Sequence, residues 1–381
     1  MEQTKPFKKD GSGVERGNGI YSIEVGGTPY EMGVQHGELL RDQIRESVAD
    51  YKTNVVKLFG QADADRIFDW VLNVADFKSS IETHLPHVLE EMGGIADGAG
   101  LPFDDVLLSN MFEEVYEAAP LMLGLQGMAG AIQGCTSFTA FAAGKRFSGQ
   151  NMDYSSNLRG KQLLIHYKPP GKPMLLYGFV GQVGGIGVNQ KGLSVFVNTL
   201  PQGAARESDG LGSAFICRML LEQSSAADAL EKLTAVPRFS GNNFVITDHH
   251  TGMVVECDAD QAIPRVQTEA QRAVVATNHA LHLNFRRDIP GLFKDGEPIR
   301  STIFLSIERM EFAQRMLHAA GDTLKVDDLK VLLTVTPVNF FNYAFETLQS
   351  CIVELDGDQL RMVASAGFDP LREWNMYTFD Q

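Results

Sequence analysis

Positive charge and long apolar runs are both scarce in this chain. Its 381 residues include 33 lysines and arginines against 48 aspartates and glutamates, giving a formal net charge of −15. Wrapping nucleic acid or docking on anionic lipid requires a basic surface, so this balance argues against both partners. No run of 18 apolar residues occurs, which predicts that no segment spans a membrane. The segment MEQTKPFKKDGSG lacks the apolar core of a secretory signal, so we expect a cytoplasmic protein.

Cysteine is also rare, with four residues at positions 135, 217, 257 and 351 and no CxxC spacing. This pattern excludes a disulfide scaffold and a zinc knuckle. A widely spaced cysteine is ordinarily a small buried hydrophobic residue, and we expect that role for Cys217, Cys257 and Cys351.

Motifs of several enzyme classes are missing as well. The sequence contains no Gly-x-Ser-x-Gly nucleophile elbow, and the Gly-Ile-Gly at 185–187 is not followed by the third glycine of a dinucleotide fingerprint. The histidines at 249–250, 279 and 282 lack cysteine or carboxylate partners at metal-ligand spacing. We therefore expect neither a metal nor an organic cofactor.

The first third of the chain has the apolar spacing of helices. Apolar residues recur three and four positions apart over 30–58, and similar stretches follow at 64–77, from Leu85-Pro86, and over 106–118 after Asp104-Asp105. Residues 121–134 are rich in glycine and methionine and have no clean period, which predicts a loop.

Beyond this loop the pattern changes to short strands. Strand-like runs occupy 136–141, 146–152, 162–167, 174–179, 193–197, 243–248, 253–257, 262–267 and 273–277, with a final hairpin of 350–355 and 359–364. Helical spacing returns at 212–222, 226–233, 300–319 and 326–333. Strands grouped with strands predict an α+β fold of antiparallel sheets covered by helices. Two sheets face to face would make an αββα sandwich, although periodicity alone leaves other α+β arrangements open.

The tetrapeptide Gly134-Cys135-Thr136-Ser137 lies where the predicted loop meets the first of these strands. Glycine permits backbone conformations that other residues avoid, so the preceding peptide could be bent toward attack by a thiol. A nucleophile at a sheet edge and an ordinary buried cysteine at a strand start both fit this segment.

Four further segments, in this order, accompany the tetrapeptide: Gly33-Val34-Gln35-His36-Gly37, Gly149-Gln150-Asn151-Met152-Asp153-Tyr154, Gly187-Val188-Asn189 leading to Asn198-Thr199, and Thr277-Asn278-His279. Together they resemble the cysteine N-terminal-nucleophile (Ntn) hydrolases. The resemblance is nearest to the acyl-coenzyme A:isopenicillin N acyltransferase family, and more distant to bile salt hydrolases and penicillin V acylases. It implies an αββα sandwich over one structural domain, with a helical small fragment, 1–134, and a catalytic fragment, 135–381.

The resemblance also implies that the chain cleaves itself between Gly134 and Cys135. A free N-terminal cysteine carries both a nucleophile and a base, because an α-amine has a pKa near 8 and can take the thiol proton. By similarity, Asp153 orients the new amine and Asn278 donates to the oxyanion, with a backbone N–H near Asn198 or Thr199 as second donor. A turn aspartate, a β-turn asparagine and a strand-end asparagine are the structural alternatives for Asp153, Asn278 and Asn198.

The arginines match the family less well. Bile salt hydrolases have an arginine where this chain has Gln150, and a second family arginine has no clear counterpart. Arg300, at the start of the helix over 300–319, is the first candidate, and Arg159 and Arg309 are weaker ones. The alternative for each is a surface or salt-bridge arginine.

The sequence thus predicts a cysteine amidohydrolase or acyltransferase that cleaves the non-peptide amide bond of a small N-acyl substrate through a thioester. Its expected partners are the two fragments of its own chain, as a heterodimer, and acyl-coenzyme A as a possible acyl donor. A hydrolase of peptide-like or bile-acid-like amides is a second enzymatic interpretation. An uncleaved, inactive protein that only binds an acyl ligand is the alternative from another class.

Overall fold

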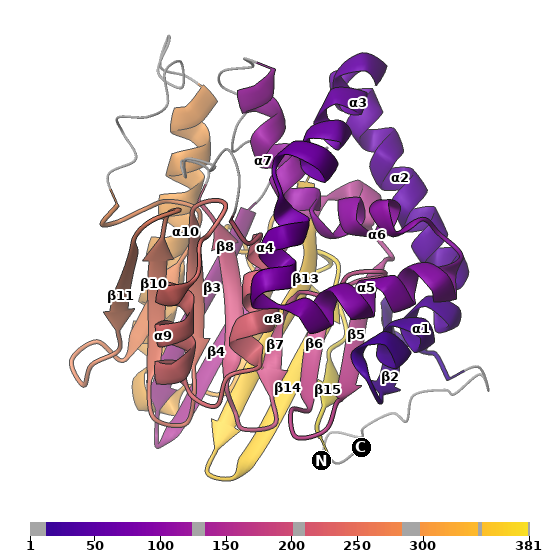
Figure 1. The fold of residues 1–381 in the computed structure, drawn as a ribbon. Coiled ribbons are helices and arrows are strands. Elements are labelled where there is room, and N and C mark those ends of the chain that lie inside the picture. Colours follow the sequence, from indigo (N-terminus) through magenta and orange to yellow (C-terminus); the bar gives the residue numbers. More distant parts are fainter. Residues whose placement is uncertain (1–12, 124–133, 201–209, 284–297, 342–344, 380–381) are drawn as a thin grey trace.

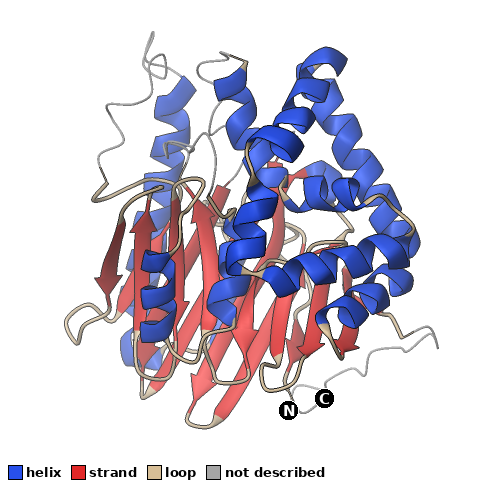
Figure 2. Cartoon of the chain, viewed as in Figure 1, coloured by secondary structure: helices blue, strands red, loops and turns tan. Residues whose placement is uncertain are grey.

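Two β-sheets face each other in the middle of the molecule, and helices cover their outer faces (Figures 1 and 2). The computed structural model describes residues 13–123, 134–200, 210–283, 298–341 and 345–379. Helices α1, α8 and α9 pack on the larger sheet, and α10 and α11 pack on the smaller one. This layering confirms the predicted αββα sandwich. None of the helices in the described ranges combines the length and apolarity that crossing a bilayer requires.

The larger sheet has nine strands in the order β1-β2-β5-β6-β7-β8-β9-β10-β11. Their bounds are β1 Glu15–Gly17, β2 Ile20–Gly26, β5 Gln162–Lys168, β6 Met174–Phe179, β7 Ile186–Asn189, β8 Ser194–Thr199, β9 Asn242–Thr247, β10 Gly252–Cys257 and β11 Ala262–Val266. The pair β2 and β5 is parallel, and the other pairs are antiparallel.

The smaller sheet has six strands in the order β12-β3-β4-β13-β14-β15, and all its pairs are antiparallel. Their bounds are β3 Gly134–Ala142, β4 Lys145–Ser155, β12 Ala273–Ala276, β13 Phe345–Asp356, β14 Gln359–Ala366 and β15 Asn375–Tyr377. The strands predicted at 136–141, 146–152 and 273–277 are therefore neighbours, which brings three of the motif segments to one sheet.

The helices follow the predicted spacing with three differences. Their bounds are α1 Pro29–Leu39, α2 Arg41–Phe59, α3 Gln61–Asp69, α4 Phe77–His84, α5 Pro86–Ala99, α6 Phe103–Asn110, α7 Phe112–Met122, α8 Ser213–Leu221, α9 Ala226–Ala235, α10 Pro298–Ala320 and α11 Val326–Thr334. The stretch 30–58 is two helices that part at Leu40, and 106–118 is divided at Met111 between α6 and α7. The stretch 64–77 ends as α3 at Asp69 and continues as a π-helix over Trp70–Val74. The predicted loop at 121–134 lies outside the described residues over 124–133.

The part of the chain before Gly134 is not purely helical, so that expectation is wrong. Strands β1 and β2 form a hairpin, and β2 continues the larger sheet by pairing with β5, for example Ile23 with Ile165. Alternating burial along IYSIEVG marks a half-buried strand that the helical pattern of the following segment obscured. The segment before Gly134 therefore belongs to the same sheet as the segment after it.

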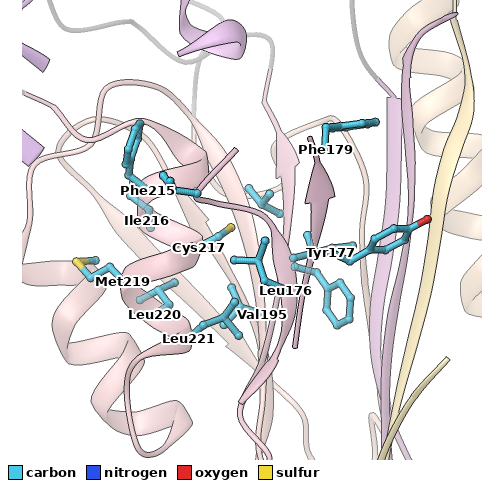
Figure 3. Packing of buried hydrophobic residues seen from close by; sticks show 14 of the residues in the cluster. Leu176, Tyr177, Phe179, Val195, Phe215, Ile216, Cys217, Met219, Leu220 and Leu221 are labelled. Atoms are coloured by element: carbon cyan, nitrogen blue, oxygen red, sulfur yellow. The ribbon is translucent and has the colours of Figure 1, made fainter. Parts of the chain in front are cut away.

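Apolar side chains fill both interfaces of the larger sheet (Figure 3). On β6, Leu176 points toward the buried face of α8, which carries Phe215 and Leu220, while Tyr177 points toward the smaller sheet. The Tyr177 hydroxyl donates to the Ser365 carbonyl oxygen of that sheet at 3.0 Å. The cysteines at 217, 257 and 351 are fully buried, which confirms their predicted role as small core residues.

A buried ion pair also connects the two parts of the chain. Glu91 on α5 accepts a hydrogen bond from Arg218 on α8 at 3.0 Å, and both side chains are at most 2% exposed. The Arg218 guanidinium lies over the Tyr167 ring at 4.3 Å, and the Tyr167 hydroxyl donates to Glu91. Removing one member would leave a buried charge without its partner, which is strongly destabilising.

Helices α1 and α5 cross so closely that only glycine fits between them. The residues at the crossing are Gly33, Gly37, Gly94 and Gly98. A Cβ atom on Gly94 would lie 2.2 Å from the Tyr30 carbonyl oxygen and 2.7 Å from the Val34 nitrogen. His36, from the same segment of α1, accepts a hydrogen bond from the Gly181 backbone at 3.1 Å. The glycines of the segment 33–37 therefore have a packing role.

Replacement of Gly94 by alanine should destabilise the protein, because the new methyl group meets backbone atoms that cannot move aside. We expect Gly94→Ala to lower the free energy of unfolding by roughly 1–3 kcal/mol, measured by urea denaturation. The neighbouring Gly93 is the matched control, since a Cβ atom there meets nothing within 4 Å. Gly93→Ala should stabilise the helix by up to about 1 kcal/mol. Equal effects of the two substitutions would contradict the close crossing.

Candidate active site

Cys135 is the second residue of β3, so it lies at the N-terminal end of this strand of the smaller sheet. Gly134 and Cys135 pair with Asp153 and Met152 of β4, and the Cys135 residue is 2% exposed. The predicted start of a strand at this point is confirmed. The thiol lies in the apolar interior with Met152 and Tyr154 rather than on an open surface.

Asp153 lies directly against the Gly134–Cys135 peptide. A Cβ atom on Gly134 would be only 2.6 Å from the Asp153 Oδ2 atom, so glycine is what allows this approach. The other carboxyl oxygen accepts a hydrogen bond from the Thr347 hydroxyl at 2.6 Å. Burial raises the pKa of Asp153 to about 6, and the charge of Arg309 and the Thr347 hydrogen bond partly oppose this rise. The carboxyl group can therefore exchange a proton near neutral pH.

Asn278 follows β12 and holds the backbone of Cys135. The Cys135 N–H donates to Asn278 Oδ1 at 2.7 Å, and Arg309 Nη2 donates to the same oxygen at 3.0 Å. The Asn278 Nδ2 group donates to the Thr199 carbonyl oxygen at 2.9 Å. Its backbone N–H donates to the Ser306 hydroxyl at 2.9 Å, which anchors the residue to α10. In the intact chain Asn278 thus binds the amide nitrogen of the very peptide bond that is expected to be cleaved.

Arg309 of α10 is the arginine that the structure brings to this site. It is 5% exposed, and its Nη1 atom donates to the Cys135 carbonyl oxygen and to the Thr136 hydroxyl, the latter at 3.0 Å. Of the two interpretations of Arg309, the surface or salt-bridge role is therefore wrong. Arg300, the preferred candidate, lies in the first turn of α10, about 13 Å along the helix axis from Arg309, and its side chain is outside the described part of the chain.

The spacing of buried residues along α10 is a sequence signal that could have identified Arg309. Ser306, Ala313 and Leu317 are all buried, and position 309 continues their spacing of three and four residues. A charged residue on the buried stripe of a helix must have a partner, which makes it a candidate functional residue. Arg159 instead forms a two-pronged ion pair with Glu346 at 2.8 and 2.9 Å, as expected for a salt-bridge arginine.

Asn198 and Gln150 tie the two sheets together beside the thiol. The Asn198 side chain accepts from the Ser137 hydroxyl and donates to the Ala276 carbonyl oxygen at 3.2 Å. Gln150 Oε1 accepts from the Val197 N–H at 3.1 Å, and its Nε2 donates to the carbonyl oxygen of the same residue. In the intact chain the Asn198 side chain is thus used for positioning, and Thr199 contributes a carbonyl acceptor to Asn278.

The thiol of Cys135 is strongly held in its protonated form. Burial, together with the carboxyl groups of Asp153 and Glu113, raises its pKa to about 12, against the opposing effects of Arg309 and Gln150. Glu113, on α7, accepts a hydrogen bond from the Tyr154 hydroxyl at 2.5 Å. The helical pattern around Glu113 did not point to the site, because only the fold brings α7 to the end of β3.

The described residues contain no group of three or more histidine, cysteine, aspartate or glutamate side chains arranged to hold a metal ion. The histidine at 279 instead hydrogen-bonds through its Nδ1 atom to the Ser306 hydroxyl at 2.8 Å. What the site offers chemically is a thiol, a buried carboxyl group, an amide and a guanidinium around one peptide bond.

Comparison with known proteins gives similarities over different shares of the chain. An Emericella nidulans protein named acyl-coenzyme A:6-aminopenicillanic-acid-acyltransferase 40 kDa form is 24% identical over 260 residues, which are 67% of this chain and 68% of that one. An uncharacterized protein of Archaeoglobus fulgidus is 24% identical over 286 residues, 68% of this chain and 47% of the relative. Among solved structures, penicillin V acylase from Agrobacterium tumefaciens has a TM-score of 0.40 at 11% identity, covering 61% of this chain and 83% of the acylase.

One family of sequences matches the chain across the site. Residues 141–326 match the model of the family described as acyl-coenzyme A:6-aminopenicillanic acid acyl-transferase. The matched segment contains Asp153, Asn278 and Arg309 and begins six residues after Cys135. Through this match and the Emericella relative, the chain is similar to the acyl-coenzyme A:6-aminopenicillanic acid acyl-transferase family over residues 141–326.

Proposed function

We propose that this chain is a self-cleaving cysteine amidohydrolase or acyltransferase that acts on the amide C–N bond of a small N-acyl substrate. The observation that carries this proposal is the position of the Cys135 backbone nitrogen, 2.7 Å from Asn278 Oδ1 and next to Asp153. Cleavage before Cys135 turns this nitrogen into an α-amine beside the thiol. The similarity of residues 141–326 to an acyl-transferase family supports chemistry on acyl groups.

The first reaction is maturation of the chain itself. The Cys135 thiol attacks the carbonyl carbon of Gly134, a C–S bond forms as the C–N bond breaks, and the thiol proton ends on the nitrogen. Water then hydrolyses this thioester and leaves a carboxylate on Gly134 and a free amine on Cys135. Asp153 supports this step, because a buried carboxyl group with a pKa of about 6 can relay a proton beside that peptide.

The second reaction is turnover of substrate. The free α-amine, with an ordinary pKa near 8, takes the thiol proton, and the resulting ammonium lowers the raised pKa of the thiol. The thiolate attacks the acyl carbon, the ammonium protonates the leaving nitrogen, and a thioester acyl-enzyme forms. Water or a second amine then accepts the acyl group. Acyl-coenzyme A is the acyl donor suggested by the name of the Emericella relative.

Asn278 and Arg309 have roles in both steps. Asn278 Oδ1 orients the Cys135 nitrogen, first as an amide and then as an amine. Release of the Thr199 carbonyl frees Asn278 Nδ2 for the oxyanion, with a backbone N–H near Asn198 or Thr199 as the second donor. Arg309 takes the place that the sequence assigned to Arg300, since it binds both Asn278 and the Cys135 carbonyl oxygen.

The two products of cleavage stay together as a heterodimer of 1–134 and 135–381. The parallel pairing of β2 with β5 and the Glu91–Arg218 ion pair both cross the cleavage point. Cleavage also frees Gly134 from its place opposite Asp153, which opens the end of β3 to a substrate.

Self-cleavage can be tested on a denaturing gel. The purified wild-type chain should give two bands of about 15 and 27 kDa, the shares of 41.8 kDa that 134 and 247 residues represent. Cys135→Ala should give one band, because the attacking thiol is gone. The N-terminal sequence of the larger fragment, determined by Edman degradation, should be Cys-Thr-Ser-Phe.

The matched control for this test is Cys257→Ala, which removes another fully buried thiol far from the scissile peptide in the sequence. This variant should cleave like the wild type. An active wild-type protein that keeps a single band would contradict the proposed mechanism, and an inactive single-band protein would favour an acyl-binding protein.

The role of Arg309 can be separated from that of Arg300 by substitution along α10. We expect Arg309→Ala to lower turnover by about 10²–10³-fold, since it removes donors to Asn278 and to the Cys135 carbonyl. Arg315→Ala is the control, because Arg315 lies on the same helix with its side chain 69% exposed. A loss of turnover in Arg300→Ala but not in Arg309→Ala would reverse the assignment. Circular dichroism checks that each variant is folded.

A further inference from the structure

Asp153 lies between two residues of the neighbouring strands. In the smaller sheet β4 lies between β3 and β13, and Asp153 pairs with Gly134 on one side and with Thr347 on the other. Directly opposed residues of antiparallel strands project to the same face, so these three residues form one row. Gly134 contributes no side chain to the row, and Thr347 contributes a hydroxyl group. Asp153 and Thr347 are 1% and 0% exposed, so their contact is shielded from water.

A β-bulge in β13 brings Thr347 opposite Asp153. Gln349 pairs with Met152, and the ladder then skips Leu348 before Thr347 pairs with Asp153. Without this skip, the apolar side chain of Leu348 would lie opposite the carboxyl group. Bulges are frequent next to active sites, where they redirect a side chain. This bulge places a hydroxyl group beside Asp153 where a regular strand would place an apolar one.

The hydrogen bonds of Thr347 fix the direction of its hydroxyl group. The Phe340 backbone N–H can only donate, and it donates to Thr347 Oγ1 at 2.9 Å. The Thr347 N–H donates in turn to the Phe340 carbonyl oxygen at 2.8 Å, which holds the two residues together. The hydroxyl hydrogen is then directed at Asp153 Oδ1, with an oxygen–oxygen distance of 2.6 Å. Within the described ranges, Oδ1 is its only hydrogen-bond acceptor.

This arrangement makes the two carboxyl oxygens of Asp153 unequal. A proton on Oδ1 would have to donate to Thr347 Oγ1, and the buried hydroxyl hydrogen of Thr347 would then lose its acceptor, which is costly. A proton on Oδ2 leaves both hydrogen bonds of the hydroxyl group intact. Oδ2 is also the oxygen next to the peptide that is expected to be cleaved, since a Cβ atom on Gly134 would lie 2.6 Å from it.

We infer that Thr347 is a positioning residue that keeps the exchangeable proton of Asp153 on Oδ2. Its effect on self-cleavage rests on the proposed function, whereas the position of the proton does not. In self-cleavage the ionised carboxylate takes the thiol proton of Cys135 at Oδ2 as the C–S bond forms. It gives the same proton to the Cys135 nitrogen as the C–N bond breaks, so Asp153 gains and loses one proton.

The charged and titratable groups around this carboxyl group come from several elements. Burial raises the pKa of Asp153 to about 6, against the opposing effects of Arg309 on α10, the hydroxyl hydrogen bond, and Arg372 after β14. The Cys135 thiol on β3 also interacts with Asp153, and its own raised pKa keeps it protonated at neutral pH. Glu113 on α7, whose pKa is raised by burial, interacts with the same thiol. A shift caused by removing the hydroxyl alone therefore reports on Asp153, the group that the hydroxyl contacts.

The position of the proton can be tested without cleavage, in the full-length Cys135→Ala protein. Neutron diffraction from its deuterated crystals at about pH 5, below the pKa of Asp153, should show deuterium on Oδ2. The Thr347 hydroxyl deuterium should point at Oδ1. Deuterium on Oδ1 would overturn the inference. This experiment leaves Thr347 in place, so it does not depend on how a variant at that position folds.

The effect on maturation can be tested by the pH dependence of self-cleavage. The chain is made by cell-free translation, diluted into buffers between about pH 5 and 9, and followed on denaturing gels. The wild-type rate should rise with pH through about 6, as Asp153 becomes ionised. In Thr347→Val the carboxylate loses a hydrogen bond that favours its ionised form, so its pKa rises and the profile should move up by about one pH unit. Thr347→Ser retains a hydroxyl and should keep the wild-type profile.

Thr247→Val is the matched control, because Thr247 is also buried and its hydroxyl donates to Thr139 at 2.8 Å. This variant should not move the profile. A merely structural role of Thr347 would lower the rate by the same factor at every pH, so a profile that stays in place in Thr347→Val would contradict the inference. A wild-type chain that does not cleave at any pH would defeat the proposed function, and the neutron experiment would still decide where the proton lies.

Discussion

The hydrogen bond between the Cys135 backbone nitrogen and Asn278 Oδ1 is the contact on which the arrangement of the site depends. It joins the end of β3 to the residues that follow β12, and Arg309 of α10 donates to the same oxygen. Three elements that are far apart in the sequence therefore meet on one atom. The contact holds whether the nitrogen belongs to a peptide or to a free amine, so a single geometry can serve both the proposed maturation and the proposed catalysis.

Burial in an apolar interior sets the pKa values of the ionisable groups in this site. The same apolar interior that raises the pKa of the Cys135 thiol to about 12 also raises that of Asp153 to about 6. A thiol with a raised pKa is a weak nucleophile at neutral pH, which suits one attack on the adjoining peptide better than repeated turnover of substrate. The proposed cleavage supplies a positive charge beside the thiol as an α-ammonium, which explains in physical terms why the intact chain would be a precursor. The raised pKa values require that water is excluded from both faces of the sandwich. The segment before Gly134 contributes to this exclusion through β2 and α5.

Much of the fold and part of the site could be predicted from local pattern. The spacing of apolar residues identified α10 and the strands from β3 to β6, and glycine before cysteine marked the start of β3. The pattern failed at β1 and β2, because a short edge hairpin ahead of a long helical stretch has a weak signal of its own. It also ranked Arg309 below Arg300, although position 309 continues the buried stripe of α10. Glu113 had no local signal at all.

The sequence by itself determined the covalent chemistry that is available, since it places one cysteine after a glycine at a strand start and an aspartate eighteen residues further on. It also determined the helical and extended segments, because hydrophobic period is a local property. Which arginine reaches Cys135 and what Asn278 binds depend on the three-dimensional fold. The physical reason is that hydrogen bonds and desolvation act over a few ångströms in space, and separation along the chain does not report that distance.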